Sequence, residues 1–245
     1  MVESQEPCEY LEWDTTFFGF PIARVRSNSL TPELATAIDN WCAAHRTHCL
    51  YFLARPDDAS TTRTAEDHGF RLMDVRLVFE HELGSIAPPS GNSIRVRPVE
   101  SGDVDALLSI ARDSYHDTRF YFDAKFPRHL CDSLYRTWIK LSCEGYADAV
   151  LVAETDGLLA GYISCHLDNK KNNVGKIGLV GVATQARGRG IGQALVCHAL
   201  EWFRGANATK VSVVTQGRNV SAQRLYQRYG FATESVHLWY HKWFV

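Results

Sequence analysis

Apolar residues change their spacing along the chain, and each change predicts a helix or a strand. Continuous or alternating apolar runs, typical of strands, occupy residues 94–98, 149–154, 158–167, 176–182 and 210–215. Apolar residues three and four positions apart, typical of amphipathic helices, occupy residues 104–110, 131–144, 193–204 and 219–229. This order predicts an α/β (α+β) fold in which helices flank a mixed central sheet.

The segment 84–93 divides the chain into two pattern-rich regions. Its sequence, GSIAPPSGNS, has the glycine, proline and serine density of a connector. We therefore predict a smaller N-terminal α/β domain at 1–83, a linker at 84–93 and a larger domain at 94–245.

The two regions share a faint internal repeat. His68-Gly69-Phe70 and Tyr229-Gly230-Phe231 are each followed by apolar residues at the same intervals. The repeat predicts that the first region is a shrunken copy of the second. Coincidence is the alternative, because a glycine commonly ends a helix before a strand.

Composition restricts the classes of function. The chain is 45% apolar and 22% charged with a net charge of −2, which offers nucleic acid no general electrostatic attraction. The N-terminus lacks the apolar core of a signal peptide, and no run approaches the ~20 apolar residues of a membrane span, so we expect a cytoplasmic protein without membrane insertion. Neither the cysteine nor the histidine spacing indicates a metal site.

Residues 187–192, with the sequence RGRGIG, follow an apolar strand and open a helix. Three glycines allow a tight turn with bare backbone N–H groups, and the helix N-terminus attracts anions. With the charges of Arg187 and Arg189, the motif predicts a diphosphate-binding loop. Its spacing fits neither a nucleoside triphosphate loop nor a dinucleotide fingerprint.

The motif Arg187-x-x-Gly190-x-Gly192 resembles the acetyl-coenzyme A signature of the GCN5-related N-acetyltransferases (GNAT), and the helix, strand and helix after it follow that family's order. The resemblance covers residues 93–245. It implies a GNAT fold and an enzyme that transfers the acetyl group of acetyl-CoA to an amine. It also implies cofactor contacts at Val180, Gly181, Val182, Arg187, Gly188, Arg189, Gly190, Ile191, Gly192, Asn219 and Tyr226.

Catalytic residues follow from the same resemblance. Tyr226 matches the family's helix tyrosine, which implies that it protonates the departing thiolate; by pattern alone it reads as a core aromatic. The central strand lacks the glutamate that many relatives carry as a base. Asp74, Glu154 and His166 are candidate substitutes, of which we name Asp74 as catalytic, although each also suits a solvated strand position. Proton loss to water is the default alternative.

Three regions resemble more narrowly the dTDP-fucosamine acetyltransferase group: residues 11–19, Arg119-Phe120, and residues 214–219 with 238–240. This resemblance implies an acceptor amine on a dTDP-linked 4-amino-4,6-dideoxy-galactose that serves surface polysaccharide assembly.

The substrate contacts that follow are aromatic and basic. The base would stack on Phe17, Phe18, Tyr121 or Phe122, and Arg119 would hold the diphosphate. Packing between the two domains is the alternative for Phe17 and Phe18.

Two other functions stay open. A GNAT enzyme of another specificity would acetylate a peptide N-terminus, a polyamine or another small amine. Asp113, Asp117 and Asp123, in and beside the segment 114–127 that is dense in aromatic residues, would suit a cationic acceptor. A regulatory module would bind coenzyme A without catalysis. The oligomeric state, including a homodimer, is also open.

Overall fold

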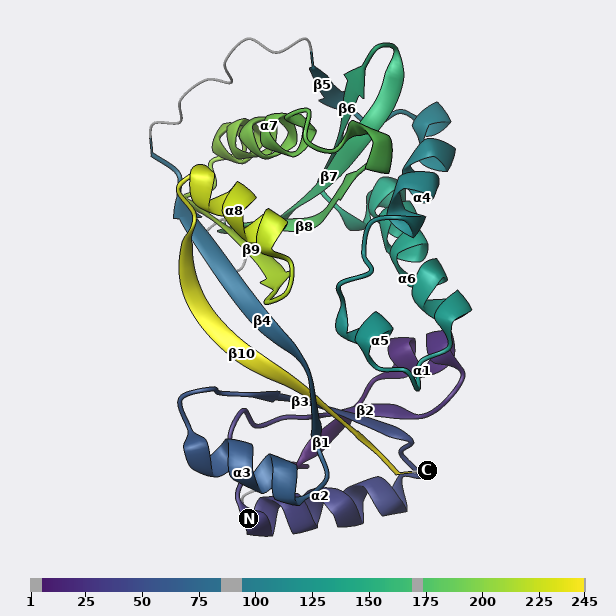
Figure 1. The fold of residues 1–245 in the computed structure, drawn as a ribbon, viewed down its shortest axis with the longest axis vertical. Coiled ribbons are helices and arrows are strands. Elements are labelled where there is room, and N and C mark those ends of the chain that lie inside the picture. Colours follow the sequence, from purple (N-terminus) through teal and green to yellow (C-terminus); the bar gives the residue numbers. More distant parts are fainter. Residues whose placement is uncertain (1–5, 85–93, 169–173, 245) are drawn as a thin grey trace.

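The computed structural model describes residues 6–84, 94–168 and 174–244 (Figure 1). Through this part of the chain runs one ten-stranded mixed sheet, in the order β1-β2-β3-β10-β4-β9-β8-β7-β6-β5, with helices packed on it. The predicted fold class, a mixed sheet flanked by helices, is confirmed.

The elements of the first region are β1 (Cys8–Tyr10), α1 (Glu12–Phe18), β2 (Ile22–Val25), α2 (Pro32–Ala44), β3 (Cys49–Ala54), α3 (Ala59–Asp67) and β4 (Arg71–Glu82). The second region begins with β5 (Arg95–Pro98), η1 (Ser101–Asp103), α4 (Val104–Arg112), α5 (Arg119–Phe122), α6 (Arg128–Leu141) and η2 (Ser142–Tyr146). It continues with β6 (Ala149–Thr155), β7 (Leu158–Asp168), β8 (Val174–Val182), η3 (Thr184–Ala186), α7 (Ile191–Gly205), β9 (Lys210–Gln216), α8 (Val220–Arg228) and β10 (Ala232–Trp243).

The last strands of the two regions are exchanged. β10 pairs with β3 of the first region, and β4 pairs with β9 of the second. β4 and β10 also pair with each other, as the two long antiparallel strands that join the upper and lower parts of the molecule in Figure 1. The two regions therefore share one sheet. The predicted linker, apart from Gly84, lies outside the described residues, so the domain boundary stays a prediction.

The internal repeat is longer than its glycine motif. Helices α3 and α8 have the same length and begin 161 positions apart, at residues 59 and 220. Asp58 and Asn219 cap them with side-chain oxygens, and Gly69 and Gly230 follow them with the same φ of 77°. Only glycine adopts such a φ at little cost, so the shared motif has a physical basis.

The two repeats differ where a helix starts. Helix α2 begins at Pro32 and is capped by the Thr31 side chain, whereas α7 follows two glycines in the left-handed conformation. The first region thus keeps the architecture of the repeat without the glycine loop.

Alternate residues of β7 face different helices. A Cβ on Gly161 would lie 3.0 Å from Ile191 of α7, whereas the Tyr162 hydroxyl lies 3.1 Å from that of Tyr115, just after α4. Because successive side chains of a strand point to opposite faces, α7 and the α4–α5 segment cover opposite sides of the sheet here.

Candidate functional site

Strands β8 and β9 stop pairing partway along their length, and we call the place where they diverge the cleft. Their parallel pairing begins at Val174 and Lys210 and stops at Ile177 and Val213, although both strands continue. Beyond Ile177, the edge of β8 that faces β9 has no strand partner among the described residues. It is open to an extended ligand that pairs with backbone. The predicted pantetheine contacts Val180, Gly181 and Val182 lie on this stretch.

An irregularity in β8 coincides with the start of the cleft. Ile163 and Cys165 of β7 pair with Val180 and Ile177, so β8 carries one extra residue. The Leu179 N–H donates instead to the Ser164 hydroxyl, at 2.8 Å. Such a bulge bends a strand, which explains why β8 leaves β9 here.

The glycine loop turns the chain from β8 into α7. Gly188 and Gly190 have φ of 75° and 84°, which only glycine adopts at little cost. We predicted that Gly192 would belong to the turn, but it lies inside α7. A Cβ on Gly192 would lie 3.1 Å from Leu225 of α8. Two glycines make the turn, and the third lets α8 approach α7.

The two arginines of the loop are tied to neighbouring loops. Arg187 donates to the Asp113 carbonyl at 3.0 Å, and Arg189 ion-pairs with Asp156 at 2.8 Å. Both pairings are exposed, so an incoming phosphate can replace them at small cost. The predicted diphosphate contacts of the loop stay predictions.

Tyr226 lies on α8 with 4% of its surface exposed. Its ring packs against Phe79 and Phe231, with centroids 6.2 and 5.7 Å away, so the ring is part of the core, as the apolar pattern alone predicts. Burial raises the pKa of its phenol, which stays protonated at neutral pH. Asn219, seven residues earlier, caps α8 by accepting the Ala222 N–H at 3.1 Å. The proton-donor role of Tyr226 stays a prediction.

Sequence reasoning missed a cluster of tyrosines at the cleft. Tyr115 stacks on Tyr135 with centroids 4.1 Å apart, and its hydroxyl lies 3.1 Å from that of Tyr162. A Cβ on Gly181 would lie 2.6 Å from the Tyr162 ring, so the cluster lies directly against β8. Burial raises the pKa of Tyr115, and the Tyr162, Tyr135 and Tyr226 phenols add to the rise, so Tyr226 lies within electrostatic reach of the cluster. Only tertiary contact joins these residues.

Asp74 lies on β4, beside a one-residue bulge at Met73, and is 4% exposed. Its Oδ1 accepts the Val75 N–H at 2.9 Å and lies 3.9 Å from Nη1 of Arg218. Burial raises the pKa of Asp74 to about 6, against the opposing charges of Arg218 and Arg119. A carboxylate with this pKa is ionised at neutral pH and suits a general base. Its catalytic role stays a prediction.

The structure links Asp74 to the tyrosine cluster. Burial raises the pKa of Tyr135 to about 12, and the Asp74 carboxylate adds to the rise while Arg119 opposes it. Asp74, Arg119 and the tyrosines therefore lie within electrostatic reach of one another.

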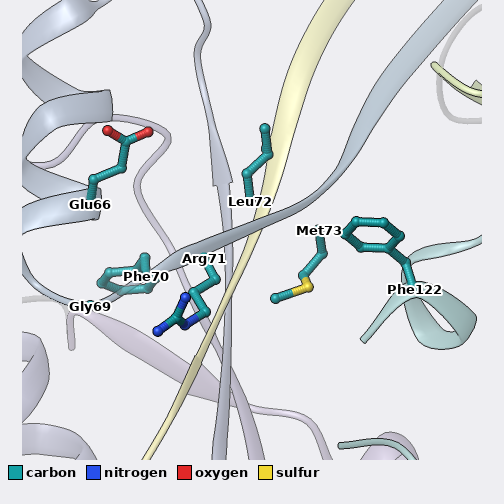
Figure 2. A pocket seen from close by; sticks show the side chains of 7 residues that line it. All are labelled: Glu66, Gly69, Phe70, Arg71, Leu72, Met73 and Phe122. Carbon is teal, nitrogen blue, oxygen red and sulfur yellow. The ribbon is translucent and has the colours of Figure 1, made fainter. Parts of the chain in front are cut away.

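A cavity of about 570 Å³ opens beside the start of β4 (Figure 2). We call it the Phe122 groove; its lining includes Glu66, Phe70, Arg71, Leu72, Met73 and Phe122. Figure 2 shows Phe122 of α5 facing Met73 across it. The Arg218 guanidinium lies 4.1 Å from the centre of the Phe122 ring, so one arginine touches both the groove and Asp74.

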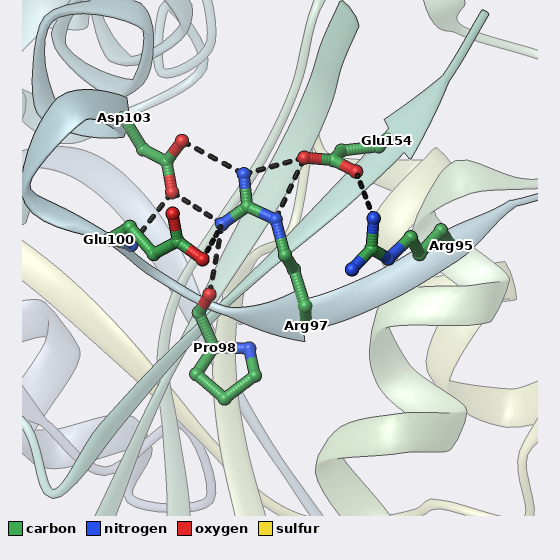
Figure 3. Close-up of polar contacts among 6 residues, drawn as sticks. All are labelled: Arg95, Arg97, Pro98, Glu100, Asp103 and Glu154. Carbon is green, nitrogen blue, oxygen red and sulfur yellow. Dashed lines mark hydrogen bonds and ion pairs between the residues drawn. The ribbon is translucent and has the colours of Figure 1, made fainter. Parts of the chain in front are cut away.

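The other two candidate bases are placed differently. Glu154 accepts from Arg97 at 2.8 Å, and Arg97 also pairs with Asp103 at 2.6 Å, a network that ties β5 to β6 and η1 (Figure 3). The side chains of Arg97 and Glu154 are both largely buried, which favours a structural role for Glu154. The His166 backbone pairs with Lys176, where β8 and β9 are still joined, but its ring reaches the start of the cleft, because a Cβ on Gly178 would lie 2.5 Å from Nε2. Its role as a base stays a prediction.

Arg119 of α5 lies between the two regions. Its guanidinium covers the rings of Tyr51 and Trp239 at 3.9 and 4.6 Å, and Nη1 donates to His241 Nε2 at 2.6 Å. His241 donates in turn to Asp123 at 2.7 Å; burial and the Arg119 charge lower the pKa of His241 to about 4, so it is neutral. No carboxylate of the described residues lies within ion-pair distance of Arg119. Its charge is available to an anion, and the predicted diphosphate contact stays a prediction.

The predicted stacking residues are mostly covered. Phe18 is 4% exposed and packs on Phe120 and Phe126 at 5.4 and 4.7 Å, which is the interdomain packing named as its alternative. Phe17 stacks on Trp13 at 5.0 Å, and the buried Tyr121 donates to Asp132 at 2.6 Å. Their contact with a base stays a prediction.

Within residues 6–84, 94–168 and 174–244, no three His, Cys, Asp or Glu side chains gather as metal ligands. In the same ranges, no helix has the length and apolar character needed to cross a membrane.

Known proteins share both the sequence pattern and the fold. Residues 106–231, just over half of the chain, match the model of the acetyltransferase (GNAT) family. The dTDP-fucosamine acetyltransferase of Escherichia coli O6:H1 is 26% identical over 96% of this chain and 97% of its own length. The spore coat polysaccharide biosynthesis protein SpsD of Bacillus subtilis is 29% identical over 60% of this chain but spans only 50% of that protein. A GCN5-related N-acetyltransferase from Sphaerobacter thermophilus has the same fold, with a TM-score of 0.72 at 21% identity over 96% of this chain and 76% of that one.

Proposed function

Because this chain belongs to the acetyltransferase (GNAT) family and is therefore an acetyl-CoA-dependent acyltransferase, we propose that its acceptor is the amine of a nucleotide-linked amino sugar. The best-supported acceptor class is a dTDP-linked 4-amino-4,6-dideoxy-galactose, and the product would serve surface polysaccharide assembly. The relative that matches the chain from end to end is a dTDP-fucosamine acetyltransferase.

The residues of the cleft fit acetyl-CoA. The unpaired edge of β8 suits the extended pantetheine arm, and the amides after Gly188 and Gly190, at the start of α7, suit the pyrophosphate. Arg187 and Arg189 add positive charge beside these amides. When bound, acetyl-CoA supplies an activated acetyl thioester.

Two residues of this chain handle protons in the proposal. Asp74 takes a proton from the acceptor ammonium, which frees the nitrogen lone pair for attack. Tyr226 gives its phenolic proton to the sulfur that the transfer releases.

One observation carries the proposal. Asp74 belongs to the first region, and strand exchange brings it beside Arg218, which follows β9 at the cleft. The full-length match with the dTDP-fucosamine acetyltransferase includes the first region, which is the region that supplies Asp74.

The test is an acceptor screen with the purified chain and acetyl-CoA. Free thiol release reports turnover, and mass spectrometry identifies the acetylated product. We expect turnover of a dTDP-linked 4-amino sugar. Acetylation of polyamines or peptide N-termini with nucleotide sugars inert would replace the proposed acceptor, and coenzyme A binding without any thiol release would favour the regulatory module.

A further inference from the structure

The Phe122 groove exposes apolar side chains that a folded chain normally covers. Phe122 is 58% exposed and Leu72 is 45% exposed, and both line the same cavity beside the buried Met73. A flat ring flanked by aliphatic walls is the usual platform for a planar ligand.

The second observation is the position of Arg218. It stacks on one side of Phe122 at 4.1 Å and donates to the Met73 carbonyl at 2.8 Å. The same guanidinium lies 3.9 Å from Asp74. Arg218 therefore fixes the platform and connects it to the candidate base.

The charged residues at the groove further restrict the class of ligand. Arg71 lines the groove and forms no ion pair within the described residues, and Glu66 is the acid of the lining. Arg218 beside the groove is shared with Asp74, so Arg71 is the guanidinium of the lining that is left for an anion. A planar group joined to phosphates fits both the aromatic platform and this guanidinium.

We propose that the Phe122 groove binds the nucleobase of the acceptor, with the attached diphosphate toward Arg71 and Arg218 and the amino sugar toward Asp74; Arg71 and Arg218 then replace Arg119 as the diphosphate contacts. The inference rests on the proposed function and adds the place where the nucleotide binds. The cavity, at about 570 Å³, is of the size that holds a small organic ligand. Phe122 is a specificity residue in this arrangement and takes no part in the chemical step.

The experiment measures dTDP binding to the full chain by calorimetry. Phe122→Ala is expected to weaken dTDP binding about tenfold, since a base stacked on an aromatic ring contributes roughly that much. Phe122→Trp should restore it. Tyr146→Ala removes an aromatic ring that is 77% exposed outside the groove, and it should leave the dTDP Kd unchanged.

Kinetics separate this inference from the proposed function. Phe122→Ala should raise KM for the nucleotide sugar about tenfold with kcat unchanged, and should not change KM for the same amino sugar 1-phosphate without its nucleoside. An unchanged dTDP Kd in Phe122→Ala, or no dTDP binding by the wild type, overturns the inference even if nucleotide sugars are acetylated. Failure of the wild type to acetylate any nucleotide sugar overturns the proposed function itself.

Discussion

Replacing Asp74 by asparagine should make the protein more stable and less active. The pKa of Asp74 is raised from 3.8 to about 6 by burial. At ~1.4 kcal/mol per pH unit, holding this carboxylate ionised at pH 7 costs the folded state about 3 kcal/mol. Asparagine keeps an oxygen for the Val75 N–H but carries no charge. We expect the free energy of unfolding to rise by up to about 3 kcal/mol, and Tm by roughly 6–12 °C.

The gain should depend on pH with a definite sign. Well below pH 3.8 Asp74 is protonated in both the folded and the unfolded state, so the wild type and Asp74→Asn should be equally stable there. Between pH 4 and 6 the unfolded state ionises first, and the wild type loses stability as pH rises. Above about pH 6 the difference should be constant. Urea unfolding followed by circular dichroism at pH 4, 5, 6 and 7 measures this.

The same variant tests the general base. We expect kcat/KM to fall ~10²-fold or more, and the acidic limb of the pH–rate profile, with a pKa of about 6 in the wild type, to disappear. Asp105→Asn changes an exposed acid of α4 and should alter neither property. Equal stability of Asp74→Asn and the wild type at pH 7 would refute the burial argument, and unchanged turnover would remove Asp74 from the chemistry.

Three further substitutions test the cleft and the repeat. Tyr226→Phe should lower kcat ~10²-fold or more with an unchanged Kd for acetyl-CoA, as measured by thiol release and calorimetry; near-normal turnover would exclude the proton-donor role. In Gly161→Ala the new Cβ meets the Gly181 carbonyl oxygen at 2.7 Å, so we expect ~1–3 kcal/mol of destabilisation and weaker acetyl-CoA binding, whereas Gly205→Ala, with no atom within 4 Å, should do neither. Gly69→Ala should cost ~1–2 kcal/mol because of its positive φ, and Gly230→Ala should cost more because His81 lies 3.2 Å from the new Cβ; equal urea midpoints would contradict this.

Local patterns determined the elements and the conformation of the glycine loop. Strand and helix periods follow from which side chains must be buried, so the predicted segments of the second region recur within a few residues. The tight turn of the glycine loop was also predictable from the sequence, because glycine is the residue that adopts a positive φ at little cost, as Gly188 and Gly190 do. The packing role of Gly192 was not predictable from local sequence, since its neighbour Leu225 is 33 positions away and only tertiary packing brings the two residues together.

The tertiary structure decided which strands are neighbours, and with them the surroundings of Asp74 and Arg119. β4 and β10 have the same alternation of apolar residues. The pattern within either region therefore does not specify that its last strand pairs with the other region. That exchange brings Asp74 next to Arg218 and forms the surroundings of Arg119 from both regions. Sequence specifies conformation through local sterics and hydrophobic period, whereas the pKa of Asp74 and the exposure of Phe122 depend on contacts between residues far apart in the chain.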